Sequence, residues 1–300
     1  MIVRVLGSAA GGGVPQWNCA CRNCAAARAG KQPRRSQSAI AVSAGGGRWI
    51  LVNCSPDIAA QVEYFAPLQP TTQRGTPIAG MLFTDANVDH IGGLSVLRQQ
   101  GDHRFIIRSS QTVREIAQAQ PAFAPFTQPP HAWLDVPLNA PCAPYDDGDP
   151  VGRDLRVRAF PVPGVTPGYD GRRTITGAAV AYEVSTVNGR TAVFAPVFSA
   201  FTPDLKDAIR RAAIAFLDGS FFDDDEMIRQ GLSGKRARAL GHLPVGGDDG
   251  TLANLETRSR VIFTHLNNSN PMLDADSSAA AAVKRAGAEI AYDGLEITLE

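Results

Sequence analysis

The first hundred residues alternate between short apolar stretches and polar or glycine-rich breaks, a pattern typical of β-strands joined by turns. Residues 2–8 predict one strand, and residues 38–53 predict two strands joined by the glycines at 45–47. Residues 79–86, "AGMLFTDA", form a continuous apolar run, as expected for a strand covered on both faces. The stretch that follows His90 is typical of a helix.

Strand and helix patterns alternate over the rest of the chain. A segment rich in proline and turn residues, 121–150, interrupts them and predicts a long excursion over the surface. Residues 289–299 predict a hairpin that closes the chain. The remaining stretches predict strands at 104–110, 155–162, 177–184, 191–197, 213–218 and 260–265, and helices at 111–120, 204–212 and 277–288.

This order, strands first and alternating strand and helix units afterwards, predicts an α/β fold in which helices cover a pair of sheets. No change in composition divides the chain, so we expect a single domain over residues 1–300. Two late strands end in polar residues, Asp218 and His265. Open α/β folds bind ligands beyond the carboxyl ends of their strands, so these two residues are candidates for a functional site.

The composition excludes some classes of partner. Twenty-nine basic and 29 acidic residues cancel, which argues against binding to nucleic acid or to an anionic membrane surface. The N-terminal sequence lacks the apolar core of a signal peptide, and no apolar run approaches the roughly 18 residues of a membrane helix. We therefore expect a cytoplasmic protein without membrane insertion.

Three cysteines lie within six positions, at Cys19, Cys21 and Cys24. Thiols stay reduced in the cytoplasm, so this cluster indicates a metal site rather than a disulfide. Three thiolates can share one tetrahedral zinc ion with a fourth ligand from elsewhere in the chain. A structural role is expected for this zinc, because catalysis would also need an open position and a polar cavity.

Residues 84–94, "TDANVDHIGGL", place four possible metal ligands directly after the apolar run: Asp85, Asn87, Asp89 and His90. A structural alternative is a helix start, with Asp89 as the N-cap. The spacing resembles the H-x-H-x-D-H signature of the metallo-β-lactamase superfamily, with Asp and Asn in place of its first two histidines. That resemblance implies an αββα sandwich.

Dinuclear members of that superfamily also take an aspartate and a histidine from the ends of late strands. By this resemblance the second metal site is complete in this chain, with the ligands Asp89, His90, Asp218 and His265. The first site has lost its imidazoles, because no histidine occurs between His131 and His242. A mixed set of imidazoles and carboxylates suits Fe(II), Mn(II) or Zn(II), and a single ion disfavours two-metal hydrolysis.

Longer segments, among them "VLGSAAGGGVPQWNCACRNC", "LDGSFFDDDEM" and "THLNNSNPML", resemble the coenzyme PQQ synthesis protein B family of that superfamily. The resemblance implies a role in making pyrroloquinoline quinone (PQQ), a redox cofactor built from a Glu and a Tyr of a small precursor peptide. One activity that it implies is iron- and O2-dependent hydroxylation of a tyrosine ring, in a small molecule or short peptide. The alternatives are a non-enzymatic carrier that assists transport of PQQ or its precursor to the periplasm, and a one-metal hydrolase.

Individual residue roles follow from this family resemblance. Asp85, Asn87 and His242 are the candidate catalytic residues, with His242 either a proton donor or substrate contact, or a structural loop histidine. Asn268 is the first candidate for the fourth zinc ligand by family position, and His265 and His242 are the alternatives. The oligomeric state stays open between a monomer and a homodimer.

Overall fold

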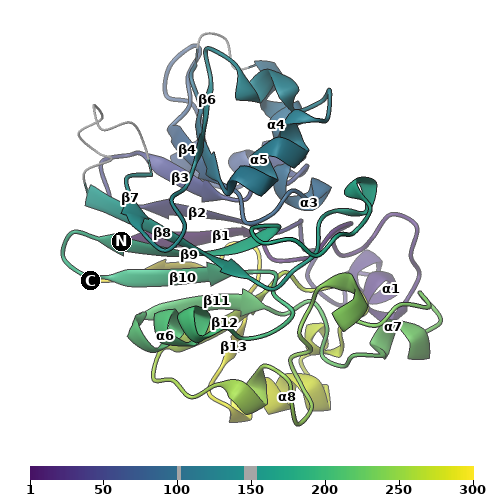
Figure 1. The fold of residues 1–300 in the computed structure, drawn as a ribbon. Coiled ribbons are helices and arrows are strands. Elements are labelled where there is room, and N and C mark those ends of the chain that lie inside the picture. Colours follow the sequence, from purple (N-terminus) through teal and green to yellow (C-terminus); the bar gives the residue numbers. More distant parts are fainter. Residues whose placement is uncertain (100–102, 145–153) are drawn as a thin grey trace.

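The fold is taken from a computed structural model that describes residues 1–99, 103–144 and 154–300. In these ranges two seven-stranded sheets pack face to face, and helices cover the outer face of each (Figure 1). The predicted αββα sandwich is therefore confirmed. The helices are α1 (Arg22–Arg28), α2 (Ile58–Glu63), α3 (Val88–Ile91), α4 (Gly93–Val96), α5 (Gln111–Gln118), α6 (Pro203–Arg211), α7 (Glu226–Arg229) and α8 (Ser278–Arg285).

Each sheet combines antiparallel and parallel strands. The first has the order β14-β1-β2-β3-β4-β5-β6 and is parallel from β3 to β6; the second has the order β13-β12-β11-β10-β9-β8-β7 and is parallel from β10 to β13. The strands of the first sheet are β1 (Ile2–Gly7), β2 (Ala39–Ser43), β3 (Trp49–Val52), β4 (Ile78–Leu82), β5 (Ile106–Ser109), β6 (Ala132–Asp135) and β14 (Glu296–Thr298). Those of the second are β7 (Pro141–Cys142), β8 (Leu155–Val162), β9 (Ala179–Thr186), β10 (Thr191–Ala195), β11 (Ile214–Asp218), β12 (Arg260–Thr264) and β13 (Glu289–Ile290).

Alternating side chains on the strands fill the core between the two sheets. On β3, Ile50 and Val52 point to the opposite sheet, whereas Trp49 and Leu51 pack under the helices of the first layer. This alternation follows from the two-residue period of a strand, and it explains why both faces of these strands are apolar.

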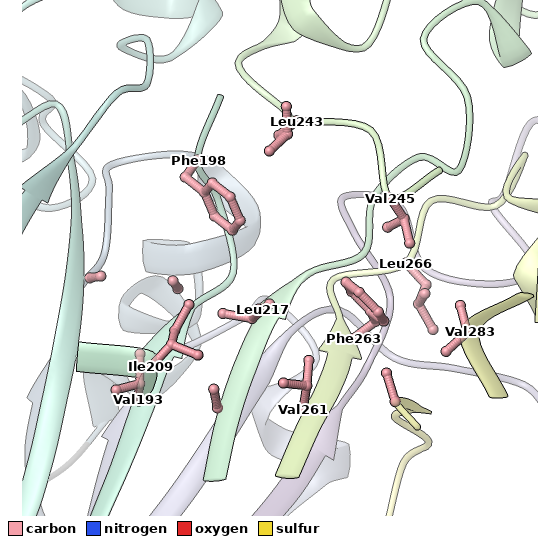
Figure 2. Close-up of a cluster of buried hydrophobic side chains, with 14 of the residues drawn as sticks. Val193, Phe198, Ile209, Leu217, Leu243, Val245, Val261, Phe263, Leu266 and Val283 are labelled. Carbon is pink, nitrogen blue, oxygen red and sulfur yellow. The ribbon is translucent and has the colours of Figure 1, made fainter. Parts of the chain in front are cut away.

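A second apolar cluster holds the strand ends that matter for function. Leu217 of β11 and Leu266, two residues after β12, are fully buried in it, and Phe263, Ile209 of α6 and Val283 of α8 pack in the same cluster (Figure 2). Leu217 precedes Asp218 and Leu266 follows His265 in the chain. Burial of these two leucines therefore fixes the backbone on which the polar residues are carried.

The prediction of a surface excursion over residues 121–150 is wrong for the part that the structure describes. Phe123, Phe126 and Trp133 are buried under the first sheet, and β6 pairs in parallel with β5. β7 adds an edge strand to the second sheet. The prolines of this segment kept the two short strands from being predicted from the sequence. Residues 145–150 lie outside the described residues.

The predicted hairpin at residues 289–299 is also wrong. β13 pairs with β12 in the second sheet, whereas β14 pairs with β1 in the first. Asp293, between them, accepts hydrogen bonds from the hydroxyls of Ser8 (2.7 Å) and Ser36 (2.9 Å). These contacts hold the turn at the first sheet, so the two short strands separate instead of pairing with each other.

Among the described residues no helix combines the length and the apolar character that crossing a bilayer requires.

Candidate functional site

The ends of two strands, one from each sheet, converge on one group of polar side chains. Asp89 and His90 lie on α3, after β4, and His265 follows β12. Their ligand atoms all lie within 4.8 Å of one another. The Nε2 atom of His265 is 3.2 Å from Oδ2 of Asp89, and Nε2 of His90 is 3.9 Å from the same oxygen. Two imidazoles and one carboxylate thus meet at a point, which is a suitable arrangement for a metal ion.

Asp218 belongs to a second, overlapping group with His242 and His265, again within 4.8 Å. Its Oδ2 accepts a hydrogen bond from Nδ1 of His242 (2.7 Å), and its Oδ1 accepts one from the Ser220 hydroxyl (2.6 Å). Oγ of Ser220 is 2.7 Å from Nδ1 of His265. Asp218 therefore orients His242 directly and His265 through Ser220, which leaves Nε2 of His265 free to bind metal.

His90 is held in the same way from the first sheet. Its Nδ1 donates to Oδ2 of Asp85 at 2.6 Å, and both side chains are buried. The Nε2 atom of His90 is buried and has no hydrogen-bond partner among the described residues. Burial alone would lower the pKa of His90, but the carboxylates of Asp85 and Asp89 raise it to about 9. The cluster thus favours a positive charge at the imidazole, which a bound metal ion would supply in place of the proton.

The other motif residues have supporting positions. Asn87 is the N-cap residue of α3, and its side-chain amide donates to Oδ1 of Asp85 at 2.8 Å. The alternative in which Asp89 caps the helix is wrong, because α3 begins at Val88 and the Asp89 carboxylate contacts His265. Asp85 stands where the superfamily signature has a histidine ligand. Its carboxylate faces His90 and orients that imidazole.

Sequence reasoning missed three residues that support this site: Ser220, Thr84 and Asn53. The Thr84 hydroxyl donates to Oδ2 of Asp85 at 3.1 Å, and the Thr84 amide donates to Oδ1 of Asn53 at 3.0 Å. Asn53 adopts a φ of 63° and His265 one of 59°, a left-handed conformation that is uncommon for residues other than glycine. Ser220, Thr84 and Asn53 share one feature that the sequence could have revealed: each lies within two residues of the end of a strand.

A cavity of about 250 Å³ opens beside the metal-binding side chains. Its polar lining residues include His242, His265, Asp89 and Asn87, and several other lining residues are apolar. Those apolar lining residues are Val165, Val197, Phe221, Met227 and Leu240. A larger cavity of about 680 Å³, next to β1 and α2, has none of the converging metal ligands in its lining. The smaller cavity is therefore the candidate substrate site.

The three clustered cysteines converge at a separate place. Their Sγ atoms lie within 4.8 Å of one another, and backbone amides donate to the sulfurs of Cys19 (3.4 Å) and Cys24 (3.3 Å). Burial, with help from the neighbouring thiols, raises the pKa of Cys21 to about 11. Three adjacent thiolates need a cation to coexist, and N–H donors to sulfur also favour the thiolate form. The residues therefore fit a zinc ion.

The side chain of Asn268 lies against all three sulfurs, with Nδ2 distances of 3.1 Å to Cys19, 3.4 Å to Cys24 and 3.6 Å to Cys21. In this orientation the amide donates hydrogen bonds to the sulfurs, and Asn268 could bind zinc only through Oδ1 after the amide turns over. His265 and His242, the alternative fourth ligands, lie in the other cluster. Asn23 of α1 donates to the carbonyls of Asn268 and Asn270, both at 2.9 Å. The cysteine cluster is thus tied to the loop that follows His265.

Comparison with known proteins agrees with this geometry. The beta-lactamase superfamily domain matches residues 48–266. The coenzyme PQQ synthesis protein B of Ruegeria pomeroyi is 38% identical over 304 residues and that of Rhizobium meliloti is 37% identical over 310. The matches cover 100% of both sequences in the first case, and 98% of this chain and 97% of the relative in the second.

Solved structures give the same result. A crystal structure of zinc-bound PqqB from Methylobacterium extorquens superposes with a TM-score of 0.92 at 34% identity, over 100% of both chains. A diphosphatase of the PhnP family shares the fold, with a TM-score of 0.69 at 18% identity, over 100% of this chain and 98% of that one. The metallo-β-lactamase fold and the family resemblance inferred from the sequence motifs are therefore confirmed. The chain belongs to the coenzyme PQQ synthesis protein B family of the beta-lactamase superfamily.

Proposed function

We propose that this protein acts in PQQ biosynthesis by hydroxylating the tyrosine ring of a PQQ precursor, with a single Fe(II) ion held by Asp89, His90 and His265. The observation that carries the proposal is the convergence of two imidazoles and one carboxylate around a buried Nε2 atom that has no partner among the described residues. When bound in such a site, Fe(II) supplies the activation of dioxygen that ring hydroxylation requires. The name of the relatives, coenzyme PQQ synthesis protein B, supports the pathway.

The role of Asp218 as a fourth ligand of the active-site metal ion stays a prediction. Both of its oxygens accept hydrogen bonds, from His242 and from Ser220. In the proposal these bonds fix the orientation of the two imidazoles, a role whose loss typically costs about 10- to 100-fold in metal affinity. Asp85 has the matching role for His90.

His242 is proposed as the residue that exchanges a proton with the substrate. Its Nδ1 donates to Asp218, so Nε2 is the atom available on the side that lines the cavity. Burial lowers the pKa of His242, but the Asp218 carboxylate more than offsets this and raises it above its ordinary value. A histidine with a raised pKa can hold a proton near neutral pH and transfer it to or from a phenol. The apolar wall of Phe221, Met227 and Leu240 would pack against the aromatic ring.

The cysteine cluster is proposed to bind a structural zinc ion through Cys19, Cys21 and Cys24, with Asn268 as the predicted fourth ligand. The hydrogen bonds from Asn23 to the loop after β12 support this role, because they join the cysteine cluster to that loop. The zinc in the Methylobacterium extorquens relative is compatible with metal binding in this family.

The direct test uses full-length protein loaded with Fe(II) under anaerobic conditions and then exposed to oxygen with glutamyl-tyrosine and ascorbate. The expected product carries one extra oxygen atom on the ring. The second oxygen atom leaves as water, and ascorbate supplies two electrons. With ¹⁸O₂, mass spectrometry should find one labelled atom in the product. A carrier would bind the dipeptide without consuming oxygen, and a one-metal hydrolase would act on esters without oxygen; either result contradicts the proposal.

Asp85→Asn tests the support of His90. The amide keeps the shape of the carboxylate but cannot hold the Nδ1–H as a charged acceptor, so the imidazole loses its fixed tautomer and part of its basicity. We expect the affinity for Fe(II) to fall about 10- to 100-fold, measured by competition with a chelator. Turnover at saturating Fe(II) should recover in part.

Asp57→Asn provides the matched control. Asp57 accepts its hydrogen bonds from Gln37, away from the metal ligands. It should bind Fe(II) as tightly as the wild-type protein. Equal affinity in the Asp85 and Asp57 variants would show that Asp85 does not support a metal ligand.

A further inference from the structure

The loop between β8 and β9 lines the cavity beside the metal-binding side chains. Val165 and Arg172 of this loop contribute to the lining. The Tyr169 hydroxyl donates a hydrogen bond to the carbonyl of Ala86, in the turn between β4 and α3. The amide of Thr166 donates to the carbonyl of Arg173 at 2.9 Å, which closes the loop on itself. The loop is therefore an ordered wall of the site, tied to the turn that leads into α3.

Two adjacent arginines in this loop have different surroundings. The guanidinium of Arg173 forms an ion pair with Asp170 at 2.6 Å. Arg172 is exposed and its guanidinium has no hydrogen-bond or ion-pair partner within the described part of the chain. Its backbone adopts a φ of 53°, directly after Gly171 at 84°. A left-handed conformation at a residue with a long side chain costs about 1–2 kcal/mol and is concentrated at functional sites.

The charges of the cavity lining make Arg172 the candidate for binding an anionic group. Among the described residues that line the cavity, it is the one with a permanent positive charge. The planar guanidinium offers parallel N–H donors that match the two oxygens of a carboxylate. Asn87 and His242, in the same lining, are neutral or titratable donors that do not provide this fork.

We propose that Arg172 binds a carboxylate of the substrate, so that the site takes amino acids or short peptides in which a free carboxylate accompanies the aromatic ring. The inference rests on the proposed function, because it concerns the same cavity. It assigns recognition of the anionic group to the β8–β9 loop and leaves the aromatic ring to the apolar wall and to His242.

The test measures binding without turnover, on zinc-loaded protein, because Zn(II) has no redox chemistry. Isothermal titration compares glutamyl-tyrosine with two analogues in which either the side-chain or the C-terminal carboxylate is replaced by an amide. We expect the wild-type protein to bind one analogue about ten-fold or more weakly than the dipeptide. Arg172→Gln should bind that analogue and the dipeptide equally, and Arg172→Lys should restore part of the difference, because it keeps the charge without the fork.

Arg173→Gln is the matched control, since its guanidinium is engaged by Asp170, and it should keep the wild-type preference. A preference that survives in Arg172→Gln would overturn the inference. Equal binding of all three ligands by the wild-type protein would also overturn the inference. If iron-loaded protein still consumed oxygen with the dipeptide in that case, the proposed function would stand and only the role of Arg172 would fail. If the wild-type protein binds none of the three, the proposed function fails and the inference with it.

Discussion

The wild-type protein is expected to bind two metal ions per chain, and the His90→Ala protein is expected to bind one. The substitution removes one of three converging ligand atoms and the imidazole that donates to the buried carboxylate of Asp85. Loss of a supporting group costs about 10- to 100-fold in metal affinity, and loss of the ligand itself should cost more. Iron should therefore fall to background after gel filtration, the zinc at the cysteines should stay, and hydroxylation should be undetectable.

Elemental analysis of anaerobically purified protein measures both ions in one experiment. His103→Ala is the matched control, because His103 bonds to the carbonyl of Ile78 at the start of β4, far along that strand from the site. It should retain both ions. An unchanged iron content in His90→Ala, with the far-ultraviolet circular dichroism of a folded protein, would rule out the proposed ligand set.

The Cys21→Ser protein is expected to lose zinc and to unfold at a lower temperature. Structural zinc contributes about 10–16 kcal/mol of apparent binding free energy in zinc-finger peptides, and that energy is folding energy. Even a fraction of it is large here, since 1 kcal/mol shifts the melting temperature of a protein of 150–250 residues by about 2–4 °C. We therefore expect the melting temperature to fall by more than ~10 °C, measured by calorimetry at a fixed zinc concentration.

Cys142→Ser is the control for the loss of a thiol. Cys142 lies on the short edge strand β7, and its replacement should leave the zinc content unchanged and the melting temperature within a few degrees. Retained zinc and an unchanged melting temperature in Cys21→Ser would contradict the structural role. Weaker iron binding is expected as well, because Asn23 joins the cysteine segment to the loop that begins at His265.

The sequence predicts most of the architecture because its strong signals are local. Short apolar stretches joined by glycines identified β2 and β3, and the runs ending in Asp218 and His265 identified β11 and β12. Where partners are distant, the same signals fail. The two stretches around Asp293 form a hairpin pattern, but distant partners take them to different sheets: β12 pairs with the first stretch, and β1 pairs with the second. The hydrogen bonds of Ser8 and Ser36 hold Asp293 between them.

The candidate site divides in the same way. Residues with metal-binding side chains are visible from their type and position, and the structure brings Asp89, His90 and His265 together. The supporting groups are not visible, because Ser220 and Thr84 are common residues whose role depends on which imidazole they face. Arg172 is missed for a further reason: its importance lies in the absence of a partner among the described residues and in a backbone angle, and neither is written in the sequence.

The pairing of β14 with β1 has a consequence for synthesis of the protein. The nitrogen of Met1 donates to the carbonyl of Leu299 at 2.8 Å, and β1 pairs with β14, a strand that the ribosome makes long after β1. Until then β1 presents unpaired N–H and C=O groups, which recruit other chains. A nascent chain that has not yet reached β14, or a chain cut before β14, is thus prone to aggregate.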